Sequence, residues 1–92
     1  MKHINWNNEK NRRLKESRNL CFEDVVYYIE KGHVVADYEH PNQSKYAGQR
    51  IMVIVMNNYA CLVPYIENNE EIFSKTIIPS RKATDLYLGE KK

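Results

Sequence analysis

The last predicted strand and the residues directly after it contain three cations that suit a phosphate group. Lys75 lies among apolar neighbours, and on a pleated strand it would share one face with Phe73 and Ile77. Arg81 and Lys82 follow where this strand ends. A guanidinium binds two phosphate oxygens at once, and an ammonium group adds positive charge. The simpler alternative is a rim lysine whose stem covers apolar surface, beside two solvated cations.

A second group of candidates lies in the loop before the central apolar strand. His40 is the side chain best suited to exchange a proton near neutral pH. Lys45 lies in the same loop, and Arg50 follows it. Tyr87, close to the C-terminal end, either presents its hydroxyl to the same area or packs into the core. A single loop histidine is often without a catalytic role, so that alternative stays open.

Motifs for several other chemistries are missing from the chain. Neither of the glycine-rich phosphate-binding sequences, G-x-G-x-x-G and G-x-x-x-x-G-K-[ST], is present. No two histidines lie four residues apart, and Cys21 and Cys61 form no C-x-x-C pair. Nothing resembles a nucleophile elbow. We therefore expect no metal site and no cofactor, and we disfavour a covalent enzyme.

The size and composition of the chain predict one folded domain over residues 1–92. Hydrophobic residues make up 42% of the sequence and charged residues 28%, which is typical of globular proteins. The longest apolar run, Ile51–Met56, is far shorter than the ~20 residues of a membrane helix, so we expect no membrane contact. Two cysteines are too few for a disulfide framework, which favours the cytoplasm.

Helical spacing, strand-like runs and turn residues predict an α+β fold. The expected helices span residues 8–18 between the caps Asn7 and Asn19, residues 22–31 ending at Gly32, and a short segment from Thr84 to Gly89. The expected strands span residues 33–39, 50–56, 59–66 and 72–79. Pro64 has no N–H, so the third strand should be an edge strand or end early. Tight loops between consecutive strands predict a four-stranded antiparallel meander with the helices on one face.

Three segments in this order form a family signature: Ile4-Asn5-Trp6-Asn7 with Lys10-Asn11, Phe22-Glu23-Asp24-Val25, and Ile77-Ile78-Pro79-Ser80-Arg81-Lys82-Ala83-Thr84 through Tyr87. Together they resemble the BrnT toxins, ribonucleases of type II toxin–antitoxin systems with a RelE-like fold. The Lys-His-Gly that such toxins usually have before the second helix reads Ser17-Arg18-Asn19 here. The family's histidine is therefore absent, and its role is not transferred to this chain.

The resemblance implies a metal-independent endoribonuclease that arrests growth. Metal-free RNA cleavage needs a base, an acid and cations on the phosphorane. In this reading Arg81 clamps the phosphate, Lys75 and Lys82 add positive charge or provide the base, and His40 exchanges the proton. The predicted RNA contacts are Lys45, Arg50 and Tyr87.

The resemblance also implies a protein partner, a ribbon-helix-helix antitoxin of the BrnA type. DNA would then be bound only indirectly, through that antitoxin. The basic first helix, with Lys10, Arg12 and Arg13, is a candidate docking surface for an acidic antitoxin segment. RNA is the other candidate for the same helix, and it predicts a steep dependence of binding on salt.

Two other functions compete with the toxin. The missing histidine and the small net charge of +2 allow a catalytically inactive protein-interaction module on the same fold. A DNA-binding accessory protein is disfavoured, because a recognition helix needs exposed polar or basic side chains. The second predicted helix begins with Glu23 and Asp24 and has an apolar face.

Overall fold

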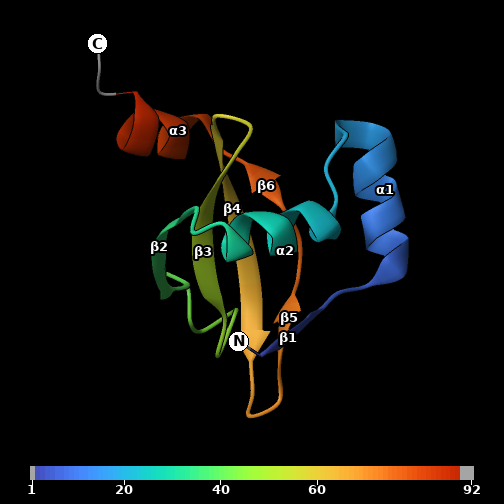
Figure 1. Ribbon diagram of the computed structural model, residues 1–92. Coiled ribbons are helices and arrows are strands. Elements are labelled where there is room, and N and C mark those ends of the chain that lie inside the picture. The colour runs from blue at the N-terminus through green and yellow to red at the C-terminus, as the bar shows by residue number, and fades with distance from the viewer. Residues whose placement is uncertain (1, 90–92) are drawn as a thin grey trace.

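The computed structural model describes residues 2–89, so residue 1 and residues 90–92 of the predicted domain lie outside it. Its strands are β1 (His3–Asn5), β2 (Val34–Glu39), β3 (Arg50–Met56), β4 (Tyr59–Glu67), β5 (Glu71–Ser74) and β6 (Ile78–Pro79). Its helices are α1 (Asn8–Arg18), α2 (Phe22–Glu30) and α3 (Arg81–Leu88). This arrangement confirms the α+β class (Figure 1).

The sheet is mixed, so the predicted four-stranded antiparallel meander is wrong in two respects. Its strand order is β1-β5-β4-β3-β2, with β6 also paired to β4. The unpredicted β1 runs parallel to β5, with His3 opposite Glu71 and Asn5 opposite Phe73. At three residues β1 is too short for an alternating pattern to indicate it.

The second difference is that the predicted strand 72–79 divides into β5 and β6 beside Pro64. The carbonyl of Pro64 accepts a hydrogen bond from the Lys75 N–H at 2.8 Å. The polar backbone edge of Pro64 therefore faces the gap between β5 and β6. An amide on that side would continue the ladder, but proline has none. Pro64 therefore stays inside a central strand, and its effect appears in the neighbouring segment, residues 75–77.

The ends of α1 agree with the predicted caps. The Asn7 side chain accepts a hydrogen bond from the Lys10 N–H at 2.9 Å, and Asn19 adopts a left-handed conformation with φ of 57°. The start of α3 differs from the prediction. The Ser80 hydroxyl accepts a hydrogen bond from the Ala83 N–H at 3.0 Å, so α3 begins at Arg81. Thr84 instead joins α3 to the sheet, because its hydroxyl accepts a hydrogen bond from the Ala60 N–H at 2.9 Å.

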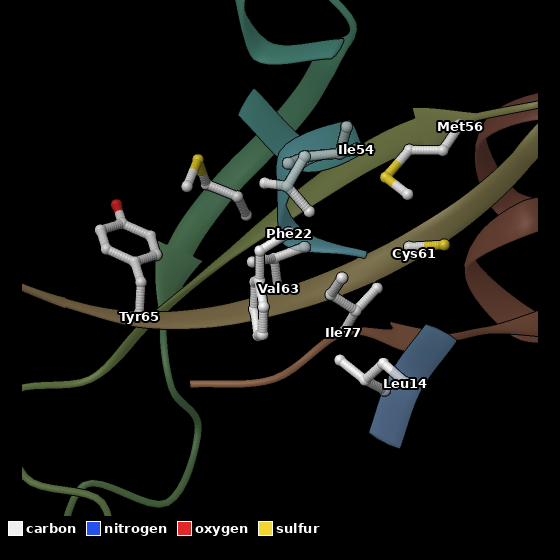
Figure 2. Close-up of a cluster of buried hydrophobic side chains, with 10 residues drawn as sticks. Leu14, Phe22, Ile54, Met56, Cys61, Val63, Tyr65 and Ile77 are labelled. Carbon is white, nitrogen blue, oxygen red and sulfur yellow. The ribbon is translucent and has the colours of Figure 1, made fainter. Parts of the chain in front are cut away.

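The helices cover both faces of the sheet, which corrects the expected single helical face. Figure 1 shows α2 lying across the strands and α3 at the end of the sheet near the β3–β4 turn. The main core lies on the α2 side, where side chains from α1, α2, β3 and β4 gather (Figure 2). The completely buried Phe22 stacks on Trp6 with 5.6 Å between ring centroids. On the opposite face, Ala83 of α3 packs only against Val53 and Ala60 and their neighbours.

An asparagine joins the two N-terminal helices. The buried Asn11 side chain accepts a hydrogen bond from the Phe22 N–H at 2.7 Å and donates one to Glu23 at 2.9 Å. The first bond satisfies a backbone donor at the start of α2, where Cys21 gives no side-chain cap. This bond fixes α1 relative to α2, and it therefore also fixes where the cations of α1 lie.

Candidate functional site

The main candidate site is a hollow of about 340 Å³ on the sheet face opposite α2. It is lined by Lys10, His40, Tyr46, Gln49, Pro64, Lys75, Thr76 and Ile78, and we call it the His40 hollow. Its floor lies on this face because Ile78 pairs with Leu62, which packs against the cluster under α3. The hollow therefore lies where the 40–49 loop, the 75–78 segment and α1 meet.

The 40–49 loop is held in place by hydrogen bonds around His40. The His40 N–H donates to the Gln49 carbonyl at 2.9 Å, which extends the β2–β3 pairing by one step. The Gln43 amide donates to the carbonyls of His40 and Gln49, at 2.8 and 3.0 Å. The His40 ring stacks on Tyr46 with 4.3 Å between centroids, and Lys45 Nζ lies 5.4 Å from the Tyr46 centroid. The loop thus presents its imidazole in a defined position.

One hydrogen bond restricts the chemistry of the His40 ring. Its Nδ1 accepts a hydrogen bond from the Asn42 N–H at 3.0 Å. In the neutral ring the proton therefore lies on Nε2, which is the nitrogen that can donate to a ligand. To accept a proton itself, Nδ1 has to release the Asn42 amide.

Lys75 brings positive charge to the same hollow. Its backbone is held by the bond to Pro64, and its exposed ammonium lies 5.7 Å from the centroid of the Phe73 ring. The predicted shared face of Phe73, Lys75 and Ile77 is wrong for Ile77, which turns into the core. With Lys10 from α1, the hollow has two lysines and no acidic side chain in its lining. This composition suits an oxyanion such as phosphate.

The other two predicted catalytic cations lie elsewhere. Lys82 and Tyr87 line a second hollow of about 310 Å³, together with Tyr38, Val53, Leu62, Ser80, Ala83 and Leu86. We call it the Lys82 hollow. It shares no lining residue with the His40 hollow on the same sheet face, although Leu62 of one and Ile78 of the other are cross-strand partners. Arg81 is exposed at the start of α3 and lines neither hollow.

Arg50 lies on the opposite sheet face, together with Met52 and the core, and does not line the His40 hollow. Its Nε donates to Asp37 at 3.1 Å, and the buried Tyr65 hydroxyl donates to the same carboxylate at 2.7 and 2.8 Å. Burial, followed by the bond to Asp37, raises the pKa of Tyr65 to about 12. Hydrogen bonds to Tyr65 and Asp37 raise the pKa of Arg50. These three side chains satisfy one another and form a structural network.

The cations of α1 divide between two sides of the helix. Lys10 and Arg13 line a third hollow, of about 260 Å³, together with Leu14, Ser17, Arg18, Thr76, Ile77 and Ile78. We call it the Arg13 hollow. Arg12 lines none of these hollows and pairs with Glu9 and, at 3.7 Å, with Glu16. The hydrogen bond from Arg12 is the main cause that lowers the pKa of Glu9.

Sequence reasoning placed Lys75 and His40 among the candidates but missed the part that Lys10 plays beside them. The sequence does not show this, because only the packing of α1 against residues 76–78 brings Lys10 to the hollow.

Comparison with protein-family models, with curated proteins and with solved structures gives no match. Within residues 2–89 no cluster of three His, Cys, Asp or Glu side chains is arranged to bind a metal ion. In the same range no helix has the length and apolar character needed to cross a membrane.

Proposed function

We propose that the protein is a metal-independent endoribonuclease toxin of a type II toxin–antitoxin system. The observation that supports this most directly is the His40 hollow, where a loop imidazole and two lysines meet without an acidic side chain. The resemblance of three segments to BrnT toxins points to the same activity. The cytoplasm is the compartment in which such a toxin meets RNA.

The proposed reaction is an internal transesterification of RNA. The 2′-oxygen bonds to phosphorus while the bond between phosphorus and the 5′-oxygen breaks, leaving a cyclic phosphate and a 5′-hydroxyl. His40 Nδ1 accepts the 2′-hydroxyl proton after releasing the Asn42 amide, and a water molecule protonates the departing 5′-oxygen. The hydroxide left from that water takes the proton from His40, which returns the imidazole to its neutral form. Lys75 and Lys10 stabilise the negative charge on the phosphorane.

The remaining predicted residues act outside the His40 hollow in this proposal. Lys82 and Tyr87 contact the RNA beyond the Leu62–Ile78 pair, and Arg81 binds a flanking phosphate at the start of α3. Lys45, at the rim of the 40–49 loop, contributes positive charge. A ribbon-helix-helix antitoxin of the BrnA type neutralises the toxin, and DNA is bound only through that partner.

The experiment that tests this proposal is RNA cleavage by purified protein in the presence of a chelator. His40→Ala should lower the cleavage rate by about 10²–10⁴-fold, the usual contribution of acid–base catalysis. Arg81→Ala and Lys82→Ala should weaken RNA binding more than they slow the chemical step. Arg50→Lys is the control for the remote network and should cleave at the rate of the natural sequence. If His40→Ala cleaves RNA at the natural rate, His40 is not the proton carrier.

A non-enzymatic interaction module is the second candidate, and one observation favours it. Leu86, Ile78 and Tyr38 on the face opposite α2 are 72%, 43% and 39% exposed, which is a surface that a partner protein could cover. Induced expression separates the two functions. A toxin arrests growth and degrades cellular RNA, whereas an interaction module leaves both unchanged.

A further inference from the structure

The His40 hollow does not end at Lys10. Lys10, Thr76 and Ile78 line both the His40 hollow and the Arg13 hollow, so the two hollows border one another along α1. We call the two hollows together the trough. One of its sides is formed by the face of α1 that bears Lys10 and Arg13. The opposite side is formed by the segment after β5, which does not continue the strand pairing because it lies beside Pro64.

The charged side chains in the lining of the trough are all basic. The charged side chains lining the two hollows are Lys10, Arg13, Arg18 and Lys75, and no Asp or Glu lines either of them. The nearest acidic partner, Glu9, lies 3.7 Å from Arg13 in an exposed pair. Exposed pairs of this kind contribute little to stability, so a phosphate can displace the carboxylate.

We infer that a single RNA strand leaves the His40 hollow along α1, with its phosphates on Lys10 and Arg13. This inference rests on the proposed function, because a strand cleaved beside His40 has to continue past the borders of that hollow. The Arg13 hollow adjoins it directly, because the two share Lys10, Thr76 and Ile78, whereas the Lys82 hollow shares no lining residue with the His40 hollow. Lys10 and Arg13 therefore bind RNA, which is the alternative that the sequence left open for them.

The opposite side of α1 provides a matched control. Arg12 pairs with Glu9 and Glu16, Lys15 lies 3.9 Å from Glu23, and neither cation lines the trough. Replacing these two residues removes the same charge from the same exposed helix as replacing Lys10 and Arg13. Any difference between the two double variants therefore reports position and not net charge.

The test measures binding of a fluorescent single-stranded 2′-O-methyl oligoribonucleotide, which has no free 2′-hydroxyl to attack phosphorus, over a range of salt concentrations. The slope of the logarithm of the binding constant against the logarithm of the salt concentration is negative. Because Lys10→Ala/Arg13→Ala loses two phosphate contacts on a single strand, this slope should become shallower by about 1.4. Arg12→Ala/Lys15→Ala should keep the natural slope and affinity. Thermal unfolding of both variants shows whether the fold is intact, and Lys10→Gln/Arg13→Gln repeats the test with different side chains.

Three results overturn the inference, and they differ from one another. If the natural protein binds and cleaves RNA but the two double variants behave alike, the trough is not the path of the strand. If, in addition, Lys10→Ala/Arg13→Ala selectively loses binding of an acidic antitoxin peptide, the trough is a protein-docking surface. If the natural protein neither binds nor cleaves RNA, the proposed function fails first, and the inference fails with it.

Discussion

The two faces of the sheet use polar side chains in opposite ways. On the α2 face, Asn11 caps the start of α2, and Asp37, Arg50 and Tyr65 satisfy one another. On the other face, α3 covers only one end, and within residues 2–89 no ion pair is formed by Lys75. A polar group with internal partners stabilises the fold, whereas a cation without one remains available to a ligand. The first face therefore holds the structure together, and the second is where we place function.

The largest stability effect should come from the core of the α2 face. Phe22→Ala removes a completely buried ring that stacks on Trp6, so the free energy of unfolding should fall by about 3–5 kcal/mol. Urea unfolding followed by circular dichroism measures this loss. A loss below about 1 kcal/mol would mean that the two faces do not differ in the way described.

The Asp37–Arg50–Tyr65 network should give the α2 face a dependence on alkaline pH. The pKa of Tyr65 is raised to about 12 in the folded chain, against about 10 when unfolded, so the folded state holds this proton more tightly. The resulting stability is fully present below pH 10 and is lost as pH rises through 12. By linkage it amounts to about 2–3 kcal/mol.

Tyr65→Phe isolates this contribution, because the two proteins differ only in the Tyr65 hydroxyl. In chemical unfolding experiments, the difference in the free energy of unfolding between the natural chain and Tyr65→Phe should become smaller from pH 9 to pH 12. A gap that stays constant with pH would show that Tyr65 has no shifted titration.

The smallest effect should come from the open face. Leu86→Ala removes a side chain that is 72% exposed, so the free energy of unfolding should change by less than about 0.5 kcal/mol. Thermal unfolding checks this value. A clear destabilisation would show that the open face also supports the fold, which would weaken the contrast with the α2 face.

Local features of the fold could be predicted from the sequence, while its long-range arrangement could not. Asn7 and Asn19 bound α1 as expected, because capping depends on neighbouring backbone groups. The start of α3 was misplaced because both Ser80 and Thr84 suit an N-cap, and only the structure shows Thr84 bonded to Ala60. Strand β1 forms through pairing with a segment about 68 residues away, as in the register of His3 with Glu71, which no local pattern encodes.

The candidate site shows the same limit. Lys75 and His40 could be proposed from their residue types, and they do line one hollow. The direction of Arg50 could not be predicted, because the rest of β3 is apolar at every position and gives no alternation to distinguish its faces. The position of Lys10 depends on how α1 packs, which in turn depends on the buried Asn11 bonds.

The proline in the middle of β4 has a consequence for how such a site can change over evolution. Lys75 reaches the His40 hollow because the neighbouring strand loses its ladder next to Pro64, and within residues 2–89 no ion pair holds its ammonium elsewhere. A residue with an amide at that position would allow the two short strands to merge and would draw the lysine into regular pairing. Any function of the His40 hollow therefore depends on a backbone nitrogen that bears no hydrogen, in a residue whose side chain lines the same hollow.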